Sequence, residues 1–480
     1  MEIRGKNIIV VGLGRSGVGA ANLLSELGAY VTVTDRKPKE ELRDFTESLN
    51  HSVRLALESH PENLFLSADM IVISPGVPLD ILPISKAKEK GISILGELEL
   101  AYQIASNQSL RPYSGVSKVS NQIRFLAITG TNGKSTTTTL LNLMLKKAGF
   151  RTILGGNIGN ALTDEIYKAL GILRHTHLDY IVAEVSSFQL ESTRDFRPKG
   201  AVILNITPDH LDRYHSLDEY YYTKTRIFEN QKEDDFLLLN ADDPETINLA
   251  SEKLKARNEK PRIFYFSRKK EVDGIYFKDG QIYCNFPDSS ISCRHSSLIN
   301  ADEIKIKGVH NLENAMAASA MALLAGSPVE AIRNSVREFI GLEHRLELVR
   351  EIGGVRYFND SKGTNVGAVV KSLESFKNSI ILIAGGRDKA GDFSLLRDLV
   401  REKVKTLVLI GEASEKIKKS LGDLTETVTA KDLREAINIS HGIAKKGDIV
   451  LLSPACASFD MFIDFEDRGR QFKKIVMELT

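Results

Sequence analysis

Residues 129–136, with the sequence TGTNGKST, combine glycine, lysine and hydroxyl side chains in an order that suits the binding of a polyphosphate. Gly130 and Gly133 allow the backbone to wrap around phosphate oxygens and to point its N–H groups at them. Lys134 can then reach the β and γ phosphates, and the hydroxyl of Ser135 can bind Mg²⁺. The chemistry indicated is the binding of a nucleoside triphosphate.

This loop lies between a strand and a helix, which is the context that phosphate binding requires. Residues 124–128 (RFLAI) are an apolar run typical of a buried strand, and residues 140–147 (LLNLMLKK) have helical character. The generic phosphate-loop pattern has a glycine at the position of Ile128, so the pattern alone leaves an ordinary glycine turn as an equal alternative. The flanking strand and helix favour phosphate binding.

A second glycine motif, Gly12-x-Gly14-x-x-Gly17, lies where the apolar run 7–14 passes into a helical stretch. The glycines let the backbone approach a phosphate, and the amino terminus of the helix offers free N–H groups. Asp35 ends the next strand, 18 residues after Gly17, where a carboxylate could contact a ribose or a base. This placement favours a nucleotide-type ligand over tight packing alone, and it leaves NAD and a UDP-sugar as alternatives.

Polar residues that could hold a metal follow two strands of the central stretch: Glu184, Asp209 and His210. Ligands of open α/β sheets gather at the carboxyl ends of strands, so these groups could bind a metal near the phosphates. On these residues alone, a hydrogen-bonded polar loop is the better interpretation. Lys224 by itself is expected to be an exposed helical lysine, and Cys456 a buried structural thiol.

The elements that must position these residues alternate between strand-like runs and helical patterns. This alternation predicts an α/β fold of three consecutive units with parallel, doubly wound sheets, which suits 480 residues at roughly 150 per domain. The polar residues 106–122 predict a linker or surface loop, and residues 262–308 predict a β-hairpin excursion. The expected divisions are 1–107, a linker at 108–124, 125–340 and 341–480.

The charge and cysteine content exclude several classes of protein. Lys and Arg number 64 against 63 Asp and Glu, and no basic stripe is visible, so nucleic acid is not expected as a partner. We expect no signal peptide and no membrane insertion, because there is no apolar stretch of about 20 residues. Cys284, Cys293 and Cys456 form no CxxC pair, which favours reduced thiols and a cytoplasmic location.

Seven segments together resemble the Mur ligases: TGTNGKST, AEVSSFQL, TPDHLDRY, HNLENA, GLEHR, NDSKGTN and SPACASFDMF. The resemblance runs nearly end to end, and the missing glycine of the phosphate loop is a feature of that family. It implies Rossmann-like first and third domains and a P-loop ATPase-type central domain. It also implies an ATP- and Mg²⁺-dependent amide ligase of peptidoglycan precursor synthesis, acting as a monomer, with UDP-N-acetylmuramoyl-L-alanine and D-glutamate as substrates.

The same resemblance implies four sets of site residues. The ATP set is Gly130, Thr131, Asn132, Gly133, Lys134, Ser135, Thr136, Asn311, Asn314, Arg345 and Asp360. The set for the UDP-linked substrate is Gly14, Arg15, Ser16, Asp35, Arg36, Gly76, Asn157 and His210. The D-glutamate set is His344, Lys362, Thr364, Lys389, Ser458 and Phe465. The metal set is Ser135, Glu184, His210 and Lys224, the last as a carbamate, and the catalytic residues are Lys134, Glu184, His210 and Lys224.

Three other functions are considered beside this one. A folylpolyglutamate synthase-like ligase would share only the central and third units, so the first glycine motif speaks against it. A dehydrogenase with an appended ATPase would bind nicotinamide, but it leaves HNLENA and SPACASFDMF unexplained. A non-catalytic nucleotide switch would not need two phosphate sites and a metal cluster.

Overall fold

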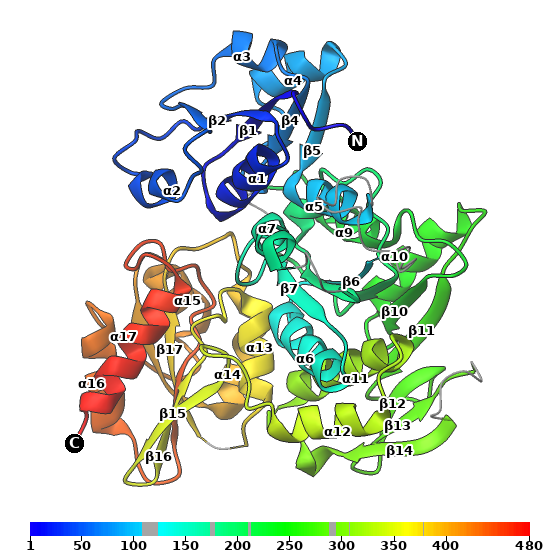
Figure 1. Cartoon of the computed structure of the whole chain (residues 1–480). Coiled ribbons are helices and arrows are strands. Elements are labelled where there is room, and N and C mark those ends of the chain that lie inside the picture. The colour runs from blue at the N-terminus through cyan, green and yellow to red at the C-terminus, as the bar shows by residue number, and fades with distance from the viewer. Residues whose placement is uncertain (108–122, 173–177, 210–212, 288–293, 307, 378) are drawn as a thin grey trace.

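A computed structural model describes the chain except for residues 108–122, 173–177, 210–212, 288–293, 307 and 378. It contains three open sheets that follow one another along the chain, each accompanied by helices (Figure 1). The predicted α/β fold of three consecutive units is therefore confirmed. Residues 108–122 of the expected linker and His210 lie outside the described residues, whereas Arg124 already belongs to a strand. The exact divisions between the units stay predictions.

The first sheet has five parallel strands in the order β3-β2-β1-β4-β5. Its strands are β1 (Asn7–Val11), β2 (Tyr30–Thr34), β3 (Arg54–Ala56), β4 (Met70–Ile73) and β5 (Ser93–Gly96). Its helices are α1 (Arg15–Glu26), α2 (Arg43–Glu47), α3 (Glu62–Leu66), α4 (Leu82–Glu89) and α5 (Glu97–Ser106). The apolar run of β1 is buried on both faces, since Ile8 and Val10 belong to one apolar cluster and Ile9 and Val11 to another.

The second sheet has nine strands in the order β14-β13-β12-β11-β10-β9-β6-β8-β7. Its parallel strands are β6 (Arg124–Thr129), β7 (Thr152–Gly156), β8 (Tyr180–Glu184), β9 (Gly200–Ile203), β10 (Phe236–Asn240), β11 (Arg262–Ser267) and β12 (Gly274–Lys278). Its helices are α6 (Lys134–Lys147), α7 (Leu162–Ile172), α8 (Ser187–Leu190), α9 (Leu217–Thr225), α10 (Pro244–Lys255), α11 (Val309–Leu324) and α12 (Val329–Glu338), with the 3-10 turns η2 (Arg226–Phe228) and η3 (Ala301–Glu303).

The predicted β-hairpin excursion forms the far edge of this sheet. Strand β13 (Gln281–Asn285) pairs antiparallel with β12 and with β14 (Arg294–Asn300). The turn between β12 and β13 has positive φ at Asp279 (49°) and Gly280 (79°), the conformation of a tight two-residue hairpin loop. The β-hairpin predicted within residues 262–308 is therefore confirmed.

One cysteine differs from the expectation of reduced thiols. Cys284 of β13 is disulfide-bonded, while Cys293 lies outside the described residues. The spacing of these cysteines was compared only with that of metal ligands. In the structure, β13 pairs antiparallel with β14, and this pairing sets Cys284 opposite Ser296. Cys456 is a free and buried thiol, as predicted.

The third sheet has six strands in the order β15-β16-β20-β17-β18-β19, with β15 antiparallel to β16. Its strands are β15 (Glu347–Ile352), β16 (Val355–Asn359), β17 (Ile380–Gly385), β18 (Val404–Ile410), β19 (Glu426–Thr429) and β20 (Ile449–Leu452). Its helices are α13 (Val366–Glu374), α14 (Arg397–Lys403), α15 (Ser414–Leu421), α16 (Leu433–Ile443) and α17 (Phe465–Glu478), with the 3-10 turn η4 (Phe393–Leu396).

Helices α1 and α5 attach the first unit to the central one. An added Cβ at Gly19 of α1 would lie 2.8 Å from Thr163 Oγ1 on α7, so glycine permits the close approach of these helices. Glu97 of α5 accepts hydrogen bonds from the backbone N (2.7 Å) and the hydroxyl (2.8 Å) of Thr163. Glu99 accepts hydrogen bonds from the backbone N–H groups of residues 194–196. Both carboxylates therefore fix α5 to the central unit.

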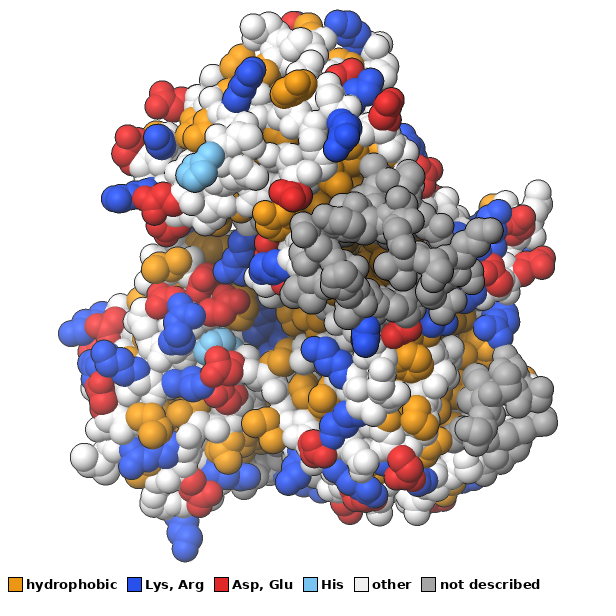
Figure 2. Space-filling view, viewed as in Figure 1, with side chains coloured by type: hydrophobic (Ala, Val, Ile, Leu, Met, Phe, Trp, Pro, Cys, Tyr) orange, Lys and Arg blue, Asp and Glu red, His pale blue; other side chains and the backbone are white. Residues whose placement is uncertain are grey.

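The third unit meets the central unit across α13 and α11, and Figure 2 shows Lys and Arg side chains around the hollow where the units meet. None of the described helices is both long and apolar enough to cross a membrane.

Candidate active site

The loop after β6 has the backbone that the glycine motif predicts. Gly130 and Gly133 have φ values of +149° and +87°, which side chains other than glycine rarely permit. An added Cβ at Gly133 would also lie 2.2 Å from Asn314 Oδ1. Helix α6 begins directly after this glycine, at Lys134, so its free N–H groups lie at the loop. These features favour phosphate binding over an ordinary glycine turn.

The two side chains that follow the loop are already engaged. Lys134 Nζ donates to the carbonyl oxygens of Gly130 and Thr131, each at 2.8 Å. The side chain of Ser135 accepts a hydrogen bond of 2.7 Å from Arg345 Nη2, which comes from the third unit. Burial lowers the pKa of Lys134. A ligand phosphate at this loop would therefore replace contacts that Lys134 now makes with its own backbone.

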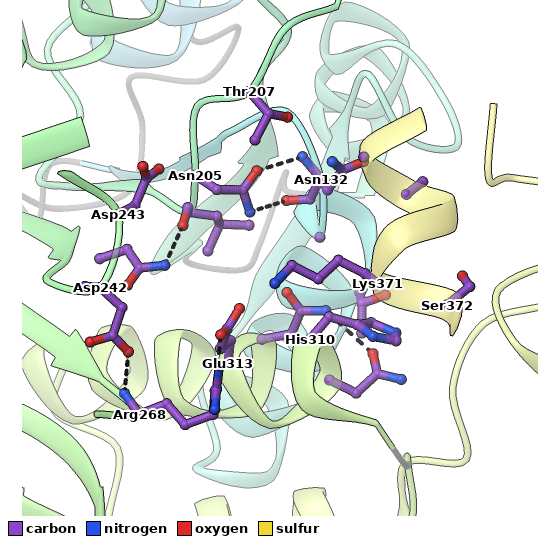
Figure 3. Close-up of a pocket in the computed structure, with 18 of the residues that line it drawn as sticks. Asn132, Asn205, Thr207, Asp242, Asp243, Arg268, His310, Glu313, Lys371 and Ser372 are labelled. Atoms are coloured by element: carbon purple, nitrogen blue, oxygen red, sulfur yellow. Dashed lines mark hydrogen bonds and ion pairs between the residues drawn. The ribbon is translucent and has the colours of Figure 1, made fainter. Parts of the chain in front are cut away.

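A cavity of about 270 Å³ lies between the central and third units (Figure 3). The predicted ATP residues that line it are Asn132, Gly133, Thr136, Asn311, Asn314, Arg345 and Asp360. Asn205 holds the backbone of Asn132 in place at this cavity. Its side chain accepts a hydrogen bond from the backbone N of Asn132 (2.8 Å) and donates one to the backbone O of Asn132 (3.1 Å). The tertiary structure thus brings together residues from distant parts of the chain.

Asp360 is a buried carboxylate at the wall of this cavity, 6% exposed. Its Oδ2 accepts hydrogen bonds from the hydroxyls of Ser372 (2.6 Å) and Ser453 (2.7 Å). Burial raises the pKa of Asp360 to about 6, although these hydrogen bonds and the charge of Arg345 act in the opposite direction. The charge of Asp360 therefore changes close to neutral pH.

Lys224 is buried, contrary to the expectation of an exposed helical lysine. It is 2% exposed, and Nζ donates to the carbonyl oxygen of Gly130 at 3.2 Å. Its ammonium also lies 4.6 Å from the centre of the Tyr220 ring. Helix α9 has no apolar stripe along one side, so its sequence does not show which side packs inward. Burial, with Lys134 nearby, lowers the pKa of Lys224 well below its usual range.

Glu184 ends β8 at the same edge of the sheet. Its Oε1 accepts a hydrogen bond of 2.8 Å from Asn157 Nδ2. Its Oε2 is buried, and no donor in the described part of the chain reaches it. Asp209 accepts a hydrogen bond of 2.9 Å from Asn365 Nδ2 of the third unit, while His210 lies outside the described residues. The described residues include no cluster of three or more His, Cys, Asp and Glu side chains suited to a metal.

The predicted D-glutamate residues lie in the third unit. Lys362 Nζ lies 3.6 Å from the centre of the Phe465 ring, and burial together with Arg345 lowers the pKa of Lys362 to about 8. His344 is buried, and its Nδ1 accepts a hydrogen bond of 2.8 Å from Asn359 Nδ2. Its backbone oxygen accepts from the N–H of Lys362 at 3.0 Å. His344 thus supports the loop that carries Lys362. Thr364 and Lys389 are partly exposed, whereas Ser458 is buried.

A second cavity, of about 170 Å³, lies at the carboxyl edge of the first sheet and includes four residues of the glycine-motif region: Gly12, Asp35, Arg36 and Gly76. The carboxylate of Asp35 accepts hydrogen bonds from the backbone N of Leu13 (2.7 Å) and Lys37 (2.9 Å). Gly14, Arg15 and Ser16 are at the start of α1. Asn157 does not line this cavity, since it is bound to Glu184 in the central unit.

Family models match all three units: the Mur ligase MurD-like N-terminal domain over residues 6–96, the Mur ligase middle domain over 128–322 and the Mur ligase glutamate ligase domain over 344–456. The chain belongs to the Mur ligase family. The relatives of this Mur ligase include proteins named UDP-N-acetylmuramoylalanine–D-glutamate ligase. The one from Geotalea daltonii is 47% identical over 100% of this chain and 99% of its own length. The one from Caldanaerobacter subterraneus is 43% identical over 100% of both chains.

Solved structures support the fold of this Mur ligase. A pseudomurein peptide ligase type C from Methanothermus fervidus aligns with a TM-score of 0.60 at 18% identity, over 99% of this chain and 100% of that one. The MurF ligase of Thermotoga maritima, solved in complex with ADP, aligns with a TM-score of 0.58 at 16% identity, over 99% and 98%. The Rossmann-like and P-loop ATPase-type domains expected from the resemblance are thus borne out.

Several residues that line the two cavities of this Mur ligase were not predicted from the sequence. In the larger cavity these are His310, Glu313, Arg268 and Lys371. Figure 3 shows Lys371 extending into the space and Arg268 beside Glu313, an ion pair of 3.3 Å. His60 lines the smaller cavity. His310 and Glu313 lie within the HNLENA segment, whereas no motif surrounds Arg268, Lys371 and His60, so only their position in the fold identifies those three.

Proposed function

We propose that this chain joins D-glutamate to UDP-N-acetylmuramoyl-L-alanine at the expense of ATP, in the synthesis of peptidoglycan precursors. The observation that carries the proposal is the cavity between the phosphate loop and the third unit. It combines a cradle for phosphates with Lys362 and Arg345, cations from a unit that matches the glutamate ligase domain. The 47% identity to a ligase of this name supports the choice of substrates.

The reaction needs two successive nucleophilic attacks. The carboxylate of the alanyl group attacks the γ-phosphate of ATP and gives an acyl phosphate and ADP. The amine of D-glutamate then attacks the acyl carbon, and phosphate leaves as the amide forms. The first step brings two anions together, so positive charge must be in place beforehand. Lys134, Arg345 and Lys362 supply that charge in this chain.

Mg²⁺ fits the region around Glu184. The buried Oε2 of Glu184 has no hydrogen-bond donor among the described residues, and carboxylate and hydroxyl oxygens are the ligands that Mg²⁺ prefers. We propose that Ser135, Glu184, His210 and a carbamate on Lys224 hold Mg²⁺ together with the phosphates. The ion supplies further neutralisation of the phosphate charge.

The environment of Lys224 supports its modification by CO₂. Burial and the nearby charge of Lys134 lower the pKa of the Lys224 amine, which favours its unprotonated form, the form that attacks CO₂. The carbamate would place an anion beside the cation of Lys134 and would supply an oxygen ligand for Mg²⁺.

The remaining assignments concern substrate binding. We propose that the ATP set binds the nucleotide in the larger cavity, and that the UDP set binds at the glycine motif of the first unit. Lys362, Lys389, Thr364 and Ser458 would contact D-glutamate, with His344 and Phe465 supporting Lys362. All three substrates have a place on one chain, so we propose that it acts as a monomer. The cytoplasmic location stays a prediction from the sequence.

The test is ATP-dependent phosphate release by the purified chain with Mg²⁺, UDP-N-acetylmuramoyl-L-alanine and a panel of amino acids. We expect release with D-glutamate alone, and a product heavier by one glutamyl residue. Release with another amino acid would leave the ligase chemistry and change the substrate. The absence of release with every amino acid, while ATP still binds, would contradict the proposal.

A further inference from the structure

Arg345 lies between two residues whose backbone conformation is unusual. The φ angle is +63° at His344 and +45° at Leu346, in the left-handed region that residues with a side chain rarely adopt. Such a conformation persists only where neighbouring contacts hold it. These contacts therefore decide whether Arg345 keeps its position, in which its Nη2 lies 2.7 Å from Ser135 Oγ of the phosphate loop.

Hydrogen bonds hold the backbone of this turn on both sides of Arg345. The N–H of His344 donates to Glu347 Oε2 at 3.0 Å, and the N–H of Leu346 donates to Asp360 Oδ1 at 3.3 Å. The carbonyl oxygen of His344 accepts from the N–H of Lys362 at 3.0 Å. Asp360 and Lys362 have tasks in the proposed reaction, whereas Glu347 has none.

The third unit fixes the carboxylate of Glu347 at this turn. Glu347 begins β15 and lies opposite Asn359, the last residue of β16. Its Oε2 accepts from Asn359 Nδ2 at 3.2 Å, and its Oε1 accepts from Lys473 Nζ of α17 at 2.5 Å. Glu347 lines neither cavity, so its connection to the larger cavity runs through the turn.

We propose that Glu347 is a positioning residue, whose carboxylate holds the turn 344–346 and so keeps the guanidinium of Arg345 at the phosphate loop. The inference rests on the proposed function, in which Arg345 contacts ATP. Without the carboxylate, the N–H of His344 loses its acceptor and the backbone is free to relax to negative φ. Arg345 then reaches the phosphate loop in only a fraction of the molecules, and the apparent affinity for ATP falls by that fraction.

The experiment measures the binding of a non-hydrolysable ATP analogue to the full chain by titration calorimetry. Glu347→Ala removes the acceptor, whereas Glu347→Gln retains an oxygen that can accept the N–H of His344. Lys473→Met is the matched control, because it removes the ion pair of Glu347 and leaves its carboxylate in place. Arg345→Met and the double variant Arg345→Met/Glu347→Ala show whether Glu347 acts through Arg345. The unfolding midpoint of each variant reports on damage to the fold.

We expect Glu347→Ala to weaken binding by about tenfold, as when about a tenth of the molecules hold the turn in place. Glu347→Gln should stay within about threefold of the wild type, since the neutral hydrogen bond remains. Lys473→Met should stay within about twofold, as is usual for a partly exposed ion pair. In the Arg345→Met background, Glu347→Ala should cause no further loss, because the turn no longer carries a guanidinium.

Four results would overturn the role of Glu347. They are wild-type affinity in Glu347→Ala, wild-type affinity in Arg345→Met, an equal loss in Lys473→Met, and the same loss from Glu347→Ala with and without Arg345. The last two would assign the effect to the fold as a whole. Phosphate release with D-glutamate is measured separately, and its absence would contradict the proposed function while the analogue still tests Glu347. A wild type that does not bind the analogue would overturn both.

Discussion

At the scale of the residue, Lys224 carries the most specific chemical prediction. Lys224→Met keeps most of the buried side-chain volume but removes the amine, so the protein should fold with an unfolding midpoint close to that of the wild type. Ligase activity should fall by about 10²- to 10³-fold, as when one preorganised charged contact to a reacting group is lost. Steady-state phosphate release and thermal unfolding measure the two effects.

The matched control is Lys253→Met. Lys253 is also a buried lysine, 9% exposed with a lowered pKa, but its Nζ pairs with Glu229 at 3.1 Å and it lines neither cavity. Its replacement should leave activity within about twofold, as is usual for changes away from a reacting centre. Equal losses in both variants would assign the effect of Lys224 to folding.

Asp360 predicts a pH dependence. Its carboxyl has a pKa of about 6 when folded, against 3.8 for the free group, so it loses its charge as the pH falls through about 6. If Asp360 contacts ATP, KM for ATP should rise below that pH, by about tenfold. Asp360→Asn should have a high KM without this rise. A wild-type KM that is flat from pH 7 to pH 5 would contradict the contact.

The raised pKa of Asp360 also determines how the stability of the protein depends on pH. A raised pKa means that folding favours the protonated carboxyl. The contribution of Asp360 to stability is therefore most favourable below pH 4 and is lost as the pH rises to about 6. The wild type should gain stability relative to Asp360→Asn as the pH falls from 7 to 5, measured as the difference in unfolding midpoint.

At the scale of the element, the turn into α1 contains two glycines with different expected roles, Gly17 in packing and Gly14 in substrate binding. An added Cβ at Gly17 would lie 2.0 Å from the carbonyl oxygen of Gly12, whereas nothing lies within 4 Å of one at Gly14. Gly17→Ala should therefore destabilise the protein by about 1–3 kcal/mol through overpacking, measured by denaturant unfolding. Gly14→Ala should leave stability close to the wild type and raise KM for the UDP-linked substrate. Equal destabilisation by Gly17→Ala and Gly14→Ala would contradict a packing role specific to Gly17.

At the scale of the whole molecule, hydrogen bonds between described residues join the central and third units. They include Arg345–Ser135 (2.7 Å), Asn365–Asp209 (2.9 Å) and His310–Ser375 (3.3 Å). The third unit is therefore docked on the phosphate loop, in a position where it would exclude water from an acyl phosphate. This arrangement is the one that we expect when ligands are bound.

Solution scattering tests that expectation. The radius of gyration should decrease when an ATP analogue and the UDP-linked substrate are added to the wild type. In Asn365→Ser the hydroxyl can still cap α13, but it is too short to reach Asp209, so the compaction should be smaller. An unchanged radius of gyration in the wild type would contradict ligand-driven closure.

The sequence by itself determined the three α/β units, the phosphate loop and the hairpin at Asp279. Each depends on local features: apolar runs of strand length, glycines at positions of positive φ, and a helix that starts directly after the loop. Its resemblance to the Mur ligases also identified segments that supply nearly half of the residues lining the larger cavity, although these segments are far apart along the chain.

Only the tertiary structure decided the burial of Lys224 and the positions of Lys371 and His60. Helix α9 has no apolar stripe, so its inward side follows from contacts with the phosphate loop, 94 residues away along the chain. The ring of His60 is positioned by Thr34 of β2, whose hydroxyl oxygen lies 3.0 Å from Nδ1. Local patterns specify backbone conformation, whereas burial, charge state and proton position depend on neighbours that folding brings together.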